Sequence, residues 1–151
     1  MELIALLHFG VTAIYSAVLL LVQVLVYPQF QAVPSSAFAR YHRGHCRRMG
    51  WVVGPLFGME GMTALVLAWQ LWTMQPLLQG ASIGLFLVGH GITFTVFIPL
   101  HHRLGSRGAD PALLRRAVKL NALRVLAASA RVMVAGAISL GVTAGRTGTG
   151  F

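Results

Sequence analysis

The sequence predicts an all-α membrane protein, an antiparallel bundle of four transmembrane helices that forms one domain over residues 1–151. The mean hydropathy is +0.73. Apolar residues make up 56% of the chain and charged residues only 10%, whereas soluble domains usually carry about 25% charged residues. The apolar residues also gather into runs of about 20 or more, which is the length that crosses a bilayer. We therefore expect lipid to surround most of the chain.

Four apolar runs predict the four spans, over residues 3–26, 51–74, 80–100 and 120–143. A tight uncharged turn over residues 75–79 is expected between the second and third spans. The fourth run is the most costly to place in lipid, because it contains two arginines, Arg124 and Arg131. Its helix is expected to begin in water near Pro111, since Asp110 suits a helix cap and proline suits a first turn.

A short amphipathic helix is predicted over residues 36–48, between the first and second spans, where Pro34 and the following serines give a helix-start signal. At about 100° per residue, its two faces differ in character. One face carries Phe38, His42, His45 and Met49, and the opposite face carries Arg40, Arg43 and Arg47. This pattern is typical of a helix at the membrane interface with its arginines toward anionic headgroups.

The basic residues predict the orientation. Residues 40–48 hold four arginines, residues 103–119 hold five Lys or Arg, and the other side carries only Arg146, in a tail expected to fray from Gly145. Basic loops stay in the cytoplasm, so we expect a bacterial inner (plasma) membrane protein with cytoplasmic loops and both termini outside. Lipid headgroups, not nucleic acid, explain the net charge of +9. The single cysteine, Cys46, excludes an internal disulfide and is expected to be reduced.

Three ionisable residues are expected near the middle of the membrane: Glu60, His90 and Arg131. Charge is costly there, so each should face the bundle interior and find a partner. They are candidate catalytic residues, with Glu60 and His90 handling a proton or a ligand and Arg131 contacting an anion or a carbonyl. The alternative is a structural ion pair between Glu60 and Arg131 that only fixes the helix register.

A polar stripe on the fourth span is formed by Asn121, Arg124 and Arg131, which share one helix face with Ala128. If this stripe faces inward, its arginines meet Glu60 and the histidines. The result would be a polar pocket open to the cytoplasmic leaflet.

Histidines supply candidate metal and cofactor ligands. His42, His45 and His101 are expected to meet at the cytoplasmic end, where three imidazoles suit Zn, Cu or Fe. The alternatives are histidines packed against headgroups, or catalysis without a metal. His8 and His90 are candidate axial ligands of a haem or a chlorophyll-type pigment, and the alternative for each is a hydrogen-bonded packing residue. Cys-x-x-Cys-His is absent, so any haem would be bound non-covalently.

Several segments carry a family resemblance that covers most of the chain: Tyr27-Pro28-Gln29-Phe30, Phe38-x-x-Tyr41-His42-x-x-His45-x-x-Arg48, Val53-x-Pro55, Glu60-x-x-Thr63-Ala64-Leu65, Pro99-Leu100-His101-x-x-Leu104, and Asn121-x-Leu123-Arg124 with Arg131 following. In these segments the chain resembles a family of small bacterial four-span membrane proteins. It is similar at greater distance to the anthrone-oxygenase-like membrane proteins. That resemblance implies an oxidation of aromatic molecules. Ala122 departs from the pattern, since a tryptophan is expected there.

Three functions follow from these observations. The first is an accessory or structural subunit of a larger respiratory or photosynthetic membrane complex, which suits the small loops. The second is a membrane oxidoreductase or oxygenase-like enzyme that acts on a lipophilic aromatic or quinone-like molecule. The third is a haem- or metal-binding module. Transport is a fourth and weaker hypothesis.

Nucleotide-binding and serine-hydrolase motifs are absent from the sequence. Gly54 and Gly58 suggest close helix packing, either inside the bundle or with membrane-protein partners or a second copy.

Overall fold

The computed structural model of the chain describes the backbone of residues 1–147 and the side chains as far as Ala144. Every regular element in that range is helical, which confirms the all-α prediction. The elements are α1 (Glu2–Leu21), η1 (Val22–Val26), α2 (Tyr27–Ala32), α3 (Ser35–Leu71), α4 (Pro76–Ile92), η2 (Thr93–Phe97), α5 (Ile98–Arg107) and α6 (Pro111–Thr147). They form four long helices, because α1, η1 and α2 are continuous, as are α4, η2 and α5.

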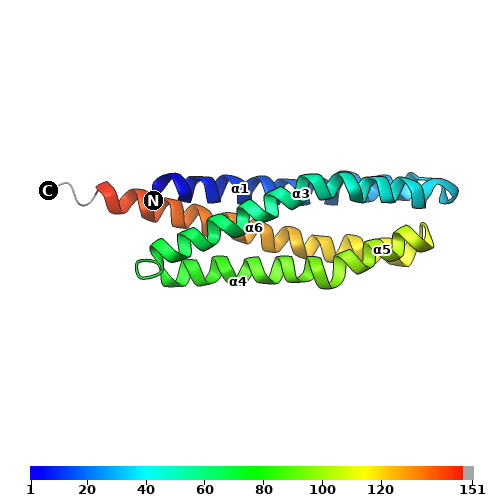
Figure 1. Ribbon diagram of the computed structural model, residues 1–151. Helices are drawn as coiled ribbons and strands as arrows, with labels where there is room; N and C mark the ends of the chain where they lie inside the picture. The colour runs from blue at the N-terminus through cyan, green and yellow to red at the C-terminus, as the bar shows by residue number, and fades with distance from the viewer. Residues whose placement is uncertain (148–151) are drawn as a thin grey trace.

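The four long helices pack as an elongated antiparallel bundle, with the start of α1 and the end of α6 at the same end (Figure 1). Each is long and apolar enough to cross a membrane. Large apolar side chains cover the outside, among them Trp51, Trp69 and Leu77, which are 79%, 91% and 88% exposed. Such a surface suits lipid rather than water.

The helices extend beyond the predicted spans, because backbone hydrogen bonding continues past the apolar run. The third helix begins at Pro76, inside the turn predicted over 75–79, and the turn itself lies at residues 72–75. Helix α6 begins at Pro111 as predicted, and the Asp110 carboxylate accepts hydrogen bonds from the backbone of Ala112 and Leu113 at 2.8 and 3.3 Å. It continues to Thr147, into the tail predicted to fray, and residues 148–151 of that tail lie outside the described residues.

Residues 36–48 are helical, but they are not a separate amphipathic helix. They form the first third of α3, which continues without a break into the second span. Gly50 lies at the expected junction and lowers helix stability by only about 1 kcal/mol relative to alanine, which is too little to end a helix. Pro55 lies inside α3 and removes the N–H that would bond to the Trp51 carbonyl. Figure 1 shows α3 beginning beside α2 and then crossing toward the start of α4.

Two π-helical turns, η1 and η2, interrupt the first and third long helices. Each ends immediately before a residue–proline pair, Tyr27-Pro28 in one case and Ile98-Pro99 in the other. The N–H of Tyr27 bonds to the Val22 carbonyl, and the N–H of Ile98 bonds to the Thr93 carbonyl. A proline has no N–H to give to the preceding turn, and a wider turn accommodates this loss. These turns were not predicted from the sequence, although the two prolines are a usable signal for them.

The bundle interior is apolar near both ends and polar in the middle. An aromatic-rich cluster fills the end near α2 and α5, with Tyr27, Phe30, Phe38, Phe97, Leu100, Leu104, Leu114 and Ala117. A smaller cluster of Ala5, Leu67, Leu71 and Ile138 fills the opposite end. Between them lie buried charged and polar side chains, which form the candidate site.

Candidate functional site within the membrane bundle

Glu60, His90 and Arg131 meet in the middle of the bundle, although they come from three different long helices. Their exposed fractions are 0%, 5% and 3%. An Arg131 guanidinium nitrogen, Nη1, forms an ion pair with Glu60 Oε1. The other carboxylate oxygen, Oε2, lies 3.4 Å from His90 Nε2. Since a charge in hydrocarbon needs a partner, this contact explains how the fold tolerates Glu60 and Arg131 there.

The hydrogen bonds of His90 define where its proton must be. His90 Nδ1 lies 2.9 Å from the Phe86 carbonyl oxygen, so Nδ1 carries a hydrogen and donates it. A neutral imidazole with that hydrogen has only a lone pair on Nε2, which faces the Glu60 carboxylate. Two lone pairs would repel each other, so a proton between Nε2 and Oε2 stabilises the contact. The geometry of the Glu60 Oε2–His90 Nε2 contact is therefore suited to sharing one proton between the two groups.

Aromatic rings surround His90 and restrict its orientation. The ring centroids of Phe86, Phe57 and Tyr15 lie 4.3, 4.5 and 5.2 Å from that of His90. The Arg131 guanidinium also lies over the Phe86 ring, 5.0 Å from its centroid. These aromatic neighbours were not singled out from the sequence as site residues.

The predicted polar stripe of α6 faces inward. Asn121, Arg124 and Arg131 are 0%, 8% and 3% exposed. Asn121 Nδ2 donates to the Leu19 carbonyl at 3.2 Å and to Gln23 Oε1 at 2.9 Å. Arg124 Nη1 donates to Asn121 Oδ1 and its Nη2 donates to the Tyr15 hydroxyl, both at 3.3 Å. The stripe therefore connects α6 with α1, and only its Arg131 reaches Glu60.

His8 has both ring nitrogens in hydrogen bonds. The Thr63 hydroxyl donates to the Met59 carbonyl at 2.8 Å, so its oxygen accepts from His8 Nδ1 at 2.9 Å. The Ser82 hydroxyl then donates to His8 Nε2 at 3.3 Å. An axial bond from His8 to a haem or pigment would break one of these contacts, as it would at His90. These contacts favour the packing role for His8.

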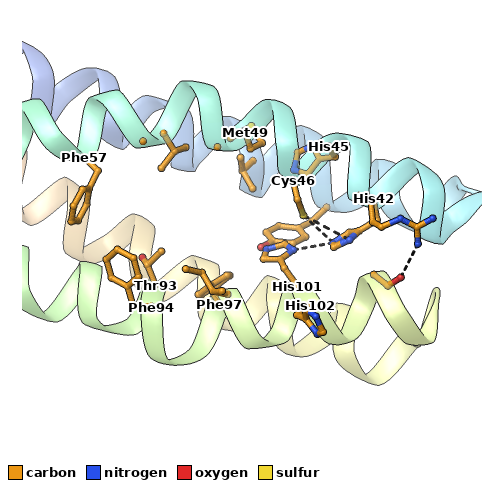
Figure 2. A pocket seen from close by; sticks show the side chains of 18 of the residues that line it. His42, His45, Cys46, Met49, Phe57, Thr93, Phe94, Phe97, His101 and His102 are labelled. Carbon is orange, nitrogen blue, oxygen red and sulfur yellow. Dashed lines mark hydrogen bonds between the residues drawn. The ribbon is translucent and has the colours of Figure 1, made fainter.

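A cavity of about 820 Å³ opens between α3 and the third long helix. His90, Tyr15 and Phe57 line its inner end, and His42, Cys46 and His101 line the end near α5. Figure 2 shows Phe94 and Phe97 between Phe57, at the inner end, and His101, at the other end. Both π-helical turns contribute to the wall, through Val22 and Thr93 among others. The cavity is thus apolar along its length and carries ionisable groups at each end.

At the outer end of this cavity, His42 and His101 meet as predicted, but Cys46 joins them where His45 was expected. His42 Nε2 and His101 Nδ1 lie 2.9 Å apart, and the Cys46 sulfur lies 3.8 Å from each ring nitrogen of His42 (Figure 2). His45 lines the same cavity but packs edge-on against Phe30, with ring centroids 5.0 Å apart. Positions 45 and 46 lie on neighbouring parts of one helix face, so spacing alone did not separate them.

Exposed tryptophans indicate where the membrane lies on α3. Trp51 and Trp69 are 79% and 91% exposed, and tryptophan favours the two membrane interfaces. The 18 residues between these positions span about 27 Å at 1.5 Å per residue, close to the roughly 30 Å of a hydrocarbon core. Glu60 lies midway between them. We infer that Glu60 and His90 lie near the midplane. Cys46 and His42, five and nine residues before Trp51, lie about 8 and 14 Å further out along α3, at the headgroup level and just beyond it.

Comparison of the chain with known protein families, with characterised proteins and with solved structures finds no match. The resemblance drawn from the sequence motifs therefore stays a prediction, as do the roles assigned to the site residues.

Proposed function

We propose that this protein binds a lipophilic aromatic or quinone-like molecule in its intramembrane cavity and exchanges a proton with it, as a membrane oxidoreductase or oxygenase-like enzyme would. The observation that carries the proposal is the cavity itself. It has a volume of about 820 Å³, within the roughly 300–1,000 Å³ range of small-molecule sites. Its wall is mainly apolar and aromatic, and its few polar groups gather at the two ends.

The inner end of the cavity has a hydrogen-bond donor and a proton-exchanging pair for an oxygen atom on an aromatic or quinone ring. The Tyr15 hydroxyl accepts a hydrogen bond from Arg124, so its own hydrogen remains available to a ligand oxygen. Beside it, His90 lines the cavity and its Nε2 lies 3.4 Å from the Glu60 carboxylate, at a distance suited to passing a proton between them. An oxygen of the ligand would accept a hydrogen bond from Tyr15, and the Glu60–His90 pair would give a proton to a phenolate form of that oxygen or take one from its phenol form, with no change of oxidation state.

The position of the cavity also suits a membrane-dissolved molecule. Its length runs from near the midplane to the level of the headgroups, so such a molecule could enter from one leaflet. The basic segments 40–48 and 103–119 are at that end. By the excess of positive charge in cytoplasmic loops, we assign it to the cytoplasmic side of a bacterial inner membrane.

The accessory-subunit prediction stays untested. The exposed apolar side chains agree equally with contact to lipid and with contact to a partner protein, so they favour neither. The cavity and the buried proton-sharing pair are specific features, and a purely structural subunit has no need of them. This difference is why we place the ligand-binding function first.

A cavity-filling variant tests the proposal. Gly54 lines the cavity, and a Cβ atom added there meets nothing within 4 Å. Gly54→Leu should fill the space and weaken binding of decylubiquinone to the purified protein by about tenfold or more, which corresponds to about 1.4 kcal/mol. Gly58→Leu is the matched control, since Gly58 is one turn further along α3, is equally unobstructed and does not line the cavity.

Binding is measured by equilibrium dialysis in lipid nanodiscs, together with mass spectrometry of lipophilic molecules extracted from the protein as purified from its native membrane. Equal binding by wild type and both glycine variants would show that the cavity is not the site. The absence of any binding or of a co-purifying aromatic molecule would reject the proposed ligand class.

A further inference from the structure

The structure assigns a metal site to His42, Cys46 and His101, and we propose that this site binds copper as Cu(I). The inference does not depend on the proposed function at the inner end of the cavity. Among the described residues, one ligand atom from each of these three side chains lies within 4.8 Å of the others. The three residues come from two helices, since His42 and Cys46 are one turn apart in α3 and His101 is in α5.

The interatomic distances are close to those of a bound ion. With metal–nitrogen and metal–sulfur bonds of about 2.05 and 2.3 Å, a tetrahedral site sets two nitrogens about 3.3 Å apart and a nitrogen and a sulfur about 3.6 Å apart. The structure has 2.9 Å between His42 Nε2 and His101 Nδ1, and 3.8 Å between Cys46 Sγ and His42 Nε2. These two distances differ from the ideal values by about 0.4 and 0.2 Å. The third, between Cys46 Sγ and the His101 nitrogen, is no longer than 4.8 Å, so binding would need a closure of at most about 1.2 Å there.

The local packing holds the two helices at the separation that the site needs. Gly105 of α5 lies against α3, where an added Cβ atom would be 3.7 Å from His42 Nδ1 and from Arg43 Cγ. Arg43 Nη1 donates to the Gly105 carbonyl at 3.3 Å. The His42 ring is also stacked on Phe38, with ring centroids 5.5 Å apart. His42 is therefore fixed in place before any ion binds.

The donor set and the surrounding charge favour Cu(I) over Zn(II). Thiolate is a soft ligand that suits Cu(I), and Met49 brings a thioether to the same cavity wall (Figure 2). One thiolate and two neutral imidazoles around Cu(I) give a complex with no net charge, whereas Zn(II) gives a charge of +1. Arg43 and Arg47 are directly adjacent in sequence to His42 and Cys46, and their positive charge would disfavour the charged complex.

Loading requires two proton movements. Cys46 binds as a thiolate, so its thiol hydrogen is released to solvent as the sulfur–copper bond forms. The hydrogen now shared between His42 Nε2 and His101 Nδ1 moves to the other nitrogen of the ring that carries it. Both facing nitrogens then offer lone pairs to the metal. The oxidation state of copper does not change in this step.

The test is an anaerobic titration of the purified full chain with Cu(I), buffered by the competing chelator bicinchoninate. We expect one tightly bound Cu(I) per chain, and an X-ray absorption spectrum with one sulfur neighbour. Cys46→Ser and His101→Gln should each weaken binding by roughly 100-fold or more, since loss of even an outer-shell partner costs about 10–100-fold. Cys46→Ser should also remove the sulfur signal.

Two neighbouring histidines provide matched controls. His102→Gln changes an exposed residue next to His101, and His45→Gln changes the residue next to Cys46. Both variants should bind Cu(I) within about twofold of wild type, as expected for side chains that are not ligands. If His45→Gln lost Cu(I) binding and Cys46→Ser retained it, the third ligand would be His45 rather than Cys46, and the assigned ligand set would be wrong. Zn(II) displacing bound Cu(I), or no bound copper in the wild type, would overturn the choice of metal or the site itself.

Discussion

Removal of the Glu60 charge should destabilise the bundle more than removal of the Arg131 charge. Glu60→Gln leaves the Arg131 guanidinium buried without its counter-charge, and arginine does not give up its proton in proteins. Arg131→Gln leaves Glu60 without its cation, but a carboxyl group can take up a proton and become neutral. Glu60→Gln therefore leaves a buried positive charge that cannot be neutralised, whereas Arg131→Gln leaves a carboxylate that can be neutralised by taking up a proton.

The structure gives the magnitude. Both side chains are almost fully buried, at 0% and 3% exposure, so solvent screening is weak. Two opposite charges about 4 Å apart attract by about 4 kcal/mol at an effective dielectric constant of 20. Breaking a buried pair from one side costs about 3–5 kcal/mol. We expect Glu60→Gln to lower the free energy of unfolding by about 3 kcal/mol or more, and Arg131→Gln by about 1–3 kcal/mol.

The assay is reversible unfolding in mixed micelles by titration with sodium dodecyl sulfate, followed by circular dichroism. The double variant Glu60→Gln/Arg131→Gln should lose much less than the sum of the two single losses, because no charge is left unpaired. Met59→Leu, a neighbouring lipid-facing position that is 48% exposed, should change stability by less than about 0.5 kcal/mol. Additive losses, or a Glu60→Gln protein as stable as the Met59→Leu control, would refute the buried pair.

The same titration checks three further predictions. Gly61→Ala places a Cβ atom 3.2 Å from Phe86 Cζ and should lower the free energy of unfolding by about 1–2 kcal/mol by displacing that ring. Gly58→Ala has open space and should raise it by up to about 1 kcal/mol. Equal effects of the two substitutions would contradict the packing of Gly61 against Phe86. Asp110→Ala removes the cap of α6 and should cost about 1 kcal/mol, while Asp110→Asn should retain most of it; a loss in both would point to charge rather than capping. Tyr15→Phe removes the acceptor of Arg124 Nη2 and should cost about 1–3 kcal/mol, and no loss would mean that Arg124 finds another partner.

Hydropathy and helical periodicity predicted the fold and much of the site. The four apolar runs became the four long helices, because only a hydrogen-bonded helix can take this chain through hydrocarbon. On α1, His8, Thr12, Tyr15 and Leu19 recur at helical spacing along one face, and all four are buried. Because a charge is costly in hydrocarbon, Glu60, His90 and Arg131 were predicted to face the bundle interior. The structure brings them together there.

Other features depend on three-dimensional packing that spacing does not determine. Positions 45 and 46 are both on the inner side of α3, and the rotation of the helix against Phe30 decided which of them faces His101. Hydropathy falls at residues 36–48 although the backbone stays helical, so polarity alone suggested a separate helix. The cavity lies between α3 and the third long helix, and no local pattern in the sequence reports the distance between two helices.

The continuity of α3 has a mechanical consequence. His42 and Glu60 are 18 residues apart, which is five full turns at about 3.6 residues per turn, so both lie on the same side of one rod about 27 Å long. A rotation of α3 about its axis at His42 would therefore also turn the Glu60 carboxylate in the same sense. Pro55, with its missing hydrogen bond, is the joint between them. The stiffness of the helix at Pro55 would therefore set how much of a rotation at His42 reaches Glu60.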